Sequence, residues 1–137
     1  MIKNPDSIEI CEILSNCKTI AVIGLSSKSH RDSRIVAEYL LGKGYNVVGV
    51  NPGSIDADGI KVYPSIEDIP MDVDIIDVFR KPDSISEIMP AVIRKKPKVF
   101  WLQLGIRNDE AVQPAFEEGI IIVQDKCIKV QHSRCSK

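Results

Sequence analysis

Apolar positions along the chain fall into short continuous runs, separated by longer segments in which they recur every three or four residues. The runs are rich in β-branched residues and end at glycine, proline or charged side chains, as buried strands do. They cover residues 19–23, 45–50, 73–79, 98–105 and 120–123. The segments between them have the periodicity of helices that turn one face to a core. The pattern therefore predicts strands and helices in alternation.

Candidate capping residues and glycines mark the ends of the helical segments. The expected helices cover residues 6–16, 33–42, 82–93, 108–119 and 124–132. We expect a kink or a break near Pro90, because an interior proline removes one backbone hydrogen bond. Residues 60–63 are expected to form only a minor extended segment, and residues 64–70 a turn of helix between two prolines.

Strands that alternate with helices in this way call for a parallel sheet covered on both faces. We expect a Rossmann-like, doubly wound α/β fold with a parallel five-stranded sheet in the order 3-2-1-4-5. The chain of 137 residues is expected to form one domain over residues 1–137. A domain of that size buries roughly two-thirds of its unfolded surface, so it needs no external staple.

Charge and hydropathy limit the partners. Lys and Arg number 18 against 19 Asp and Glu, which gives a net charge of -1 and no general attraction to nucleic acid or to an anionic membrane. No apolar run approaches the roughly 18 residues that span a bilayer, and the first residues lack the apolar core of a signal peptide. We therefore expect a cytoplasmic protein that is either a monomer or a weak homodimer. The sequence does not identify a protein partner.

The cysteines do not form a recognisable framework. They stand at Cys11, Cys17, Cys127 and Cys135, without a Cys-x-x-Cys pair, so reduced thiols are expected. The spacing of Cys127, His132 and Cys135 fits no common zinc pattern, and no metal site is predicted.

A polar loop follows the first strand and leads into the second helix. The strand ends at Gly24, and the helix begins at Ser33. In α/β proteins this connection is where phosphate is usually held, because free amides and the positive end of the helix face the anion. Lys28, Arg31 and Arg34 add positive charge, and His30 adds a conditional one. With only one glycine, an ordinary solvated turn remains the alternative.

Other residues are expected at the same edge of the sheet. Asn51 and Pro52 end the second strand where an NAD-binding fold carries an acid for the ribose, which disfavours NAD. Arg80 follows the strand at 73–79 and either shares an anion with the loop cations or is solvated. Gln103, near the end of an apolar strand, either pairs with neighbouring backbone or turns to a ligand, and we favour the ligand.

The motifs taken together resemble a known family. They are Thr19–Ser26, Lys28–Ser33, Val50–Pro52, Val62–Ser65, Val73–Arg80, Trp101–Gly105 and Asp125–Cys127 with His132. This combination is similar to the small stand-alone CoA-binding proteins, which are themselves similar to the nucleotide-binding domain of the succinyl-CoA synthetase alpha subunit. The resemblance covers roughly residues 13 to 134, and it departs from the family pattern at Ser29, Arg34 and Gln131.

The resemblance implies that coenzyme A (CoA) or an acyl-CoA lies across the carboxyl edge of the sheet. It assigns the glycine loop to Gly24, Leu25 and Ser26, the loop cation to Lys28 or Arg31, and the helix-starting serine to Ser33. The adenosine region then falls near Asn51 and Pro52, with Phe79 and Arg80 beside the phosphates and Gln103 and Leu104 along the pantetheine arm. A pyrophosphate and a 3′-phosphate suit a loop with several cations.

Catalysis is not expected. Neither His30 nor His132 has an orienting partner that the sequence reveals, and Cys127 is interpreted as an ordinary buried cysteine rather than a reactive thiol. The chain is therefore predicted to be a binding module that acts as a carrier, sensor or accessory subunit. The alternative is an NAD(P)-binding oxidoreductase or NAD(P)-sensing domain in which Arg31 or Arg34 accepts the 2′-phosphate.

Overall fold

The computed structural model describes residues 2–53 and 55–135, and Met1, Ser54, Ser136 and Lys137 lie outside the described residues. The strands in these ranges are β1 (Thr19–Ile23), β2 (Asn46–Val50), β3 (Lys61–Tyr63), β4 (Ile75–Val78), β5 (Val99–Leu102) and β6 (Ile121–Val123). The helices are α1 (Ser7–Asn16), α2 (Asp32–Gly42), α3 (Ile85–Lys95), α4 (Asp109–Glu117) and α5 (Ile128–Ser133). Short 3₁₀ turns, η1 (Ile66–Asp68) and η2 (Pro82–Ser84), precede β4 and α3.

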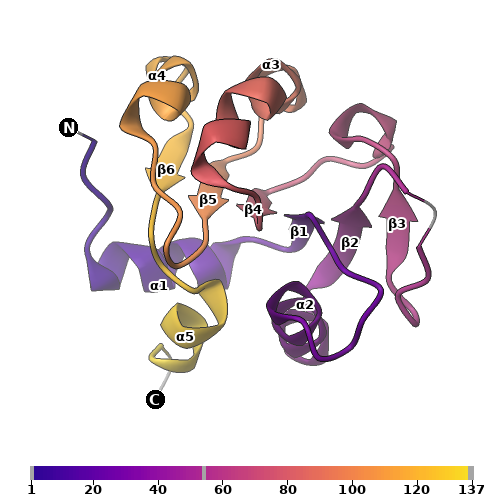
Figure 1. Ribbon diagram of the computed structural model, residues 1–137. Coiled ribbons are helices and arrows are strands. Elements are labelled where there is room, and N and C mark those ends of the chain that lie inside the picture. The colour runs from indigo at the N-terminus through magenta and orange to yellow at the C-terminus, as the bar shows by residue number, and fades with distance from the viewer. Residues whose placement is uncertain (1, 54, 136–137) are drawn as a thin grey trace.

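The described strands form one parallel sheet in the order β3-β2-β1-β4-β5-β6. Figure 1 shows α3 and α4 on one face of this sheet, and α1, α2 and α5 on the other. The chain thus winds to both faces from a central strand, β1. This confirms the predicted doubly wound α/β fold.

Successive strand positions enter two separate hydrophobic cores. Ala21 and Ile23 of β1 pack in the core that includes Met89 of α3. Ile20 and Val22 pack on the opposite face, in the core that includes Leu40 of α2. Because side chains of a strand alternate between faces, a sheet covered on both sides needs apolar residues at every position. This requirement explains why the strands are continuous apolar runs in the sequence.

Two details of the predicted sheet are wrong. We expected five strands in the order 3-2-1-4-5, with the strand at 73–79 beside the second strand. The structure adds β3 as a sixth strand among the described residues and places it at that edge, whereas β4 pairs directly with β1. The reason is burial: β4 is buried at every position and needs a neighbour on both sides, while β3 is partly or fully exposed and tolerates an edge.

Four of the described helices begin and end within three residues of the predicted ranges, whereas α5 begins at Ile128, four residues later than expected. Asp6 and Glu9 form a reciprocal capping box at the start of α1, with Glu9 N donating to Asp6 Oδ1 at 2.9 Å. We expected a kink or a break near Pro90, and α3 continues through this residue without a break. Pro90 and Ser86, whose carbonyl loses its usual donor, are both exposed, so water can take the place of that bond. None of the described helices combines the length and apolar character needed to cross a membrane.

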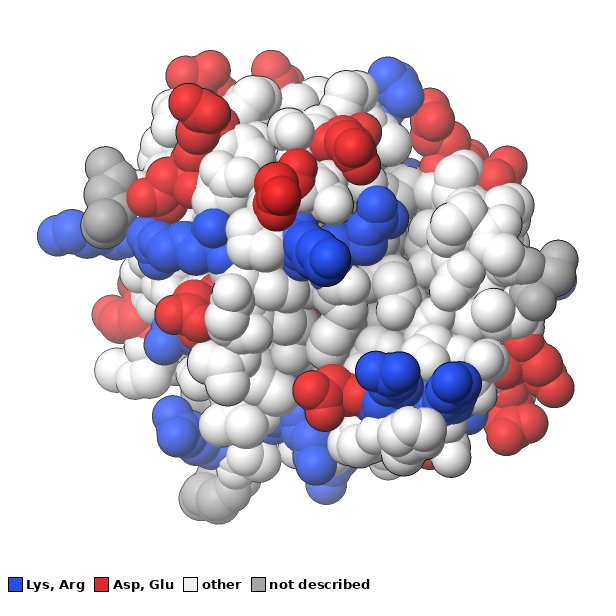
Figure 2. Space-filling view, viewed as in Figure 1, with Lys and Arg blue, Asp and Glu red and all other residues white. Residues whose placement is uncertain are grey.

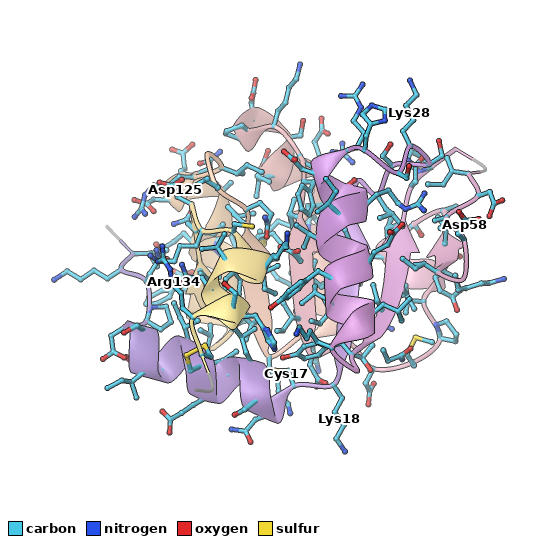
Figure 3. The ribbon with its side chains drawn as sticks, turned by 90° about the horizontal axis from the view of Figure 1, so that it is seen from below. Cys17, Lys18, Lys28, Asp58, Asp125 and Arg134 are labelled. Atoms are coloured by element: carbon cyan, nitrogen blue, oxygen red, sulfur yellow. A yellow bond between two sulfur atoms is a disulfide. The ribbon has the colours of Figure 1, made fainter. Side chains whose placement is uncertain are left out.

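A disulfide joins the two ends of the chain, which corrects the expectation of reduced thiols throughout. Cys11 of α1 is bonded to Cys135, which follows α5, across 124 positions of sequence. The pairing arises because α1 and α5 lie side by side on the same face of the sheet, where Figure 3 shows the bonded sulfur atoms. Cysteine spacing carries no information about this packing. Cys17 and Cys127 are free thiols.

Candidate functional site

The carboxyl ends of the strands bring several loops to one edge of the sheet. Ile23 at the end of β1 is in register with Val50 of β2 and with Val78 of β4. Figure 3 shows Cys17 and Lys18 at the start of β1, with Lys28 and Asp125 at the opposite edge. The loops that follow β1, β2, β4, β5 and β6 therefore share this carboxyl edge, which is where open α/β sheets bind ligands.

Gly24 makes the turn that leads out of β1. Its φ is 84°, and its amide donates to Val50 O at 2.9 Å. A Cβ atom at this position would lie 2.5 Å from the carbonyl oxygen of Phe79, at the end of β4. Both the backbone angle and the lack of space require glycine here. The sequence identified this glycine, and the structure shows why it cannot be replaced without a shift.

Internal hydrogen bonds hold the loop between β1 and α2. Ser33 Oγ accepts from Ser26 N at 3.0 Å, and Ser26 Oγ accepts from Lys28 N at 3.0 Å. Asn51 Nδ2 donates to Leu25 O at 2.9 Å. These side chains were predicted to contact the ligand, and they lie at the predicted edge. Through these hydrogen bonds each of them also fixes the backbone of the loop.

Unpaired amides remain where the loop meets α2. Within the described residues, the backbone N–H groups of Ser27, Asp32 and Ser33 make no hydrogen bond. Arg31 precedes the helix and supplies no side-chain cap. The first amides of a helix attract an anion when no side chain satisfies them. These amides are therefore uncompensated donors at the point where the loop after Gly24 enters α2.

Cations lie around these amides. Lys28 and Arg31 are exposed in the loop, and Arg80 follows β4 with its guanidinium 3.8 Å from Glu87. Among the Lys and Arg side chains visible in Figure 2, one group lies beside the start of α2 and another near the end of β4. Arg34 does not join them, because its buried guanidinium is occupied by Glu38 and by loop carbonyls. Our expectation that Arg34 could accept a 2′-phosphate is therefore corrected.

The residues predicted along the pantetheine arm behave differently from one another. Gln103 is only 4% exposed, and its Oε1 accepts from Ile128 N at 3.0 Å. It pairs with backbone rather than turning to a ligand, because the first amide of α5 is buried and needs an acceptor. This corrects the orientation that we favoured. Leu104 is 70% exposed and open to a ligand.

The remaining predicted residues differ in whether they present backbone or side-chain groups at the carboxyl edge. The Leu25 side chain is fully buried, so this residue can present only its backbone. Pro52 is exposed, and Phe79 is partly buried against the core beneath α2. The edge thus combines backbone groups from β1 with exposed apolar surface from β2 and β5.

Asp125 is a structural contributor to this edge whose contact the sequence did not reveal. It has a φ of 59°, and its Oδ1 accepts from Gly105 N at 2.6 Å. Its own amide donates to Ile106 O at 3.0 Å. Asp125 thus holds the loop that presents Leu104. A residue with positive φ that bonds another loop has no periodic signal in a sequence.

Asp77 is a buried carboxyl in the middle of β4. It is 0% exposed, and neither oxygen has a hydrogen-bond partner among the described residues. Its neighbours in register are Val22 of β1 and Trp101 of β5, both fully buried. Burial in these apolar surroundings raises the pKa of Asp77 well above its ordinary value of 3.8. Asp77 therefore holds its proton to a higher pH than an exposed aspartate does.

The histidines and the free Cys127 are separated in the structure. His30 is exposed in the loop. His132 of α5 lies with its Nδ1 2.8 Å from the Tyr39 hydroxyl of α2, an orienting partner that the sequence did not reveal. Cys127 is partly buried just before α5. No group of three or more His, Cys, Asp or Glu side chains suited to a metal ion occurs in the part of the chain that the structure describes.

The parallel sheet, the helices on both of its faces and the glycine turn after β1 define a Rossmann-like α/β protein. The particular family follows from comparison with known proteins. The model of the CoA binding domain family matches residues 18–133, and the chain belongs to this family.

Relatives of similar length share the whole chain. The uncharacterised protein YneT of Bacillus subtilis (strain 168) is 37% identical over 131 residues, which cover 96% of this chain and 97% of YneT. A hypothetical protein from Pyrococcus horikoshii OT3 superposes with a TM-score of 0.90 at 39% identity, over 98% of this chain and 96% of that one. A Thermus thermophilus structure gives a TM-score of 0.90 at 37% identity, over 95% of this chain and 98% of its own.

Proposed function

We propose that this protein binds CoA or an acyl-CoA at the carboxyl edge of its sheet. One observation carries the proposal: the unpaired amides of Ser27, Asp32 and Ser33 lie beside Gly24, where the loop enters α2. Membership of the CoA binding domain family names the class of ligand that suits this arrangement. The pyrophosphate is expected on these amides, because they are the uncompensated donors at the positive end of α2.

The rest of the edge is expected to hold the remaining parts of CoA. Lys28, Arg31 and Arg80 supply charge for the pyrophosphate and the 3′-phosphate. The adenosine is expected near Asn51 and Pro52, and the pantetheine arm along Leu104. These positions extend over loops from β1, β2, β4 and β5, which suits a long ligand that lies across the edge.

The biological role that we propose is binding without turnover, as a cytoplasmic carrier, sensor or accessory module. None of the groups described at the carboxyl edge is arranged as an acid, base or nucleophile with an orienting partner. His132 has such a partner in Tyr39, but the pair lies between α2 and α5. The protein is therefore proposed to retain and present its ligand.

Nicotinamide cofactors are a weaker alternative. The amide of Asn51 stands where an acid would hold the ribose, and it donates to Leu25 O. The buried guanidinium of Arg34 is occupied, which leaves Arg31 as the candidate for a 2′-phosphate. Neither feature favours NAD or NADP over CoA.

Calorimetric titration with CoA, acetyl-CoA, NAD and NADP tests the proposal. We expect CoA or acetyl-CoA to bind at least tenfold more tightly than either nicotinamide cofactor. The variant Lys28→Ala should weaken CoA binding, whereas Lys18→Ala, an exposed lysine at the opposite edge in Figure 3, should not. Mass spectrometry of the ligand retained after purification is an independent check. Binding of a nicotinamide cofactor without a response to CoA would overturn the proposal.

A further inference from the structure

Arg34 is the basic side chain with the least exposure in the described part of the chain, at 1%. It is the third residue of α2, so it lies directly behind the loop that leads from Gly24. A guanidinium carries five N–H donors and a permanent charge, and burying it is costly unless partners satisfy both. The hydrogen-bond partners of Arg34 therefore show which parts of the structure its burial stabilises.

Acceptors from three segments of the chain surround the guanidinium. Nη1 donates to the carbonyl oxygen of Ser27 at 2.8 Å and lies 3.4 Å from that of Ser26. Nε and Nη2 donate to Glu38 Oε2 at 3.1 and 2.7 Å. Nη2 is also 3.7 Å from Asp58 Oδ2, in the loop after β2. Arg34 thus links the loop after β1, the second turn of α2 and the loop after β2.

The contacts with Ser26 and Ser27 set the direction of the loop amides. In a trans peptide the C=O and N–H bonds point in opposite directions. When Ser26 O turns in toward Arg34, the N–H of Ser27 must turn away from it. The Ser27 amide has no acceptor within the described residues and is one of the groups to which we assign the pyrophosphate. Arg34 therefore orients the Ser27 N–H group without making a hydrogen bond to it.

The charge of Arg34 is paired with a carboxylate of the same helix. Glu38, four residues further along α2, accepts from two of the Arg34 nitrogens, and its own side chain is 47% exposed. The Asp58 carboxylate is 87% exposed and 3.7 Å away, so solvent screens it and its contribution is small. Arg34 is therefore already paired and contributes little charge to binding a ligand phosphate. We assign the phosphate contacts to the exposed Lys28 and Arg31.

We infer that Arg34 is a positioning residue for the anion site: it orders the loop from inside and turns the Ser27 amide outward, without touching the ligand. This inference rests on the proposed CoA function and concerns the same edge. A binding loop that is ordered before the ligand arrives avoids the entropy of ordering it on binding. Arg34 thus contributes to affinity through preorganisation rather than through charge.

The experiment compares Arg34→Lys and Arg34→Met with Arg31→Met, each titrated with CoA at several salt concentrations. Lysine keeps the charge but cannot reach the carbonyls of Ser26 and Ser27 together with Glu38, since it lacks the planar fork. We expect both Arg34 variants to bind CoA roughly tenfold more weakly, with the salt dependence of the wild type. Arg31→Met should instead weaken binding and flatten that dependence, because it removes an exposed cation.

Amide NMR of the ligand-free proteins supplies the readout that a general loss of packing would not move. The resonance of the Ser27 amide should shift in Arg34→Lys, while amides of β5 and β6 stay in place. Should Arg34→Met fail to fold, as judged by circular dichroism, Arg34→Lys alone decides. Wild-type affinity in Arg34→Lys, or a flattened salt dependence, would overturn the inference. Failure of the wild type to bind CoA would overturn the proposed function instead.

Discussion

Gly24 and Phe79 belong to different crossovers, yet their backbones lie so close that the Phe79 carbonyl oxygen would be 2.5 Å from a Cβ atom at position 24. The two residues directly follow the adjacent parallel strands β1 and β4, and Phe79 N donates to Ile23 O at 2.9 Å. The glycine turn is therefore determined by the neighbouring strand as well as by its own φ. The path of the loop after β1 depends on the position of β4.

Replacement of Gly24 by alanine should destabilise the fold by about 2–4 kcal/mol, because a strained φ adds to a backbone clash. Gly119→Ala is the matched control, since its φ of 86° is nearly the same as the 84° of Gly24 but no atom lies within 4 Å of its Cβ position. The control should lose only about 1 kcal/mol. Urea unfolding of both variants measures the difference. Equal losses in the free energy of unfolding would show that the Phe79 backbone can shift without an energetic cost.

The Arg80→Ala variant should weaken CoA binding by about 1–3 kcal/mol if its guanidinium donates to a phosphate. Its ion pair with Glu87 is long, at 3.8 Å, and both partners are partly exposed, so its loss alone should change stability little. Arg94→Ala is a suitable control, because it removes another exposed arginine that pairs with a glutamate, Glu67. Calorimetry that finds equal affinities for the two variants would identify Arg80 as a solvated rim residue.

The buried carboxyl of Asp77 should make stability fall as pH rises. Its pKa in the folded state is raised by burial above the ordinary value of 3.8, so the folded state holds the proton more tightly than the unfolded chain. The free energy of unfolding should therefore decline from about pH 4 upward and level off above the folded-state pKa. Asp77→Asn should lack this decline. Denaturant titrations across this pH range measure it, and identical slopes in both proteins would contradict the assignment.

Reduction of the bond between Cys11 and Cys135 should lower the free energy of unfolding by about 3–5 kcal/mol, because the loop that it closes spans 124 positions. The Cys11→Ser, Cys135→Ser double variant should show the same loss without reductant. Cys127→Ser, which changes a free cysteine, serves as the control. If reductant leaves the unfolding midpoint of the wild type unchanged, the two cysteines are not bonded under those conditions.

The sequence predicted local structure well wherever one signal dominated. The apolar run that ends at Gly24 became β1, and Ser33 lies in the first turn of α2 as expected. Asp6 caps α1. In each case neighbouring residues decide the conformation, through propensity, capping or a backbone angle that favours glycine. These signals are readable without knowledge of the fold.

Features that depend on distant partners were missed. The three residues of β3 are too few to show a period, and they form a strand only because Val48 and Val50 offer an edge. Arg34 looked like a free cation, although burial behind the loop commits it to internal acceptors. The same reason applies to Gln103, whose partner Ile128 lies 25 positions away. Sequence spacing does not show which polar side chains the fold will bury against internal hydrogen-bond partners.

The disulfide also changes the covalent connectivity of the chain. From Cys11 to Cys135 the backbone and the disulfide together form a covalent ring. A single cut in the exposed turn at Asp58 and Gly59 would open this ring without dividing the protein into two molecules. Whether such a nicked chain stays whole would then be decided by the reducing power of its surroundings as well as by the packing of its cores.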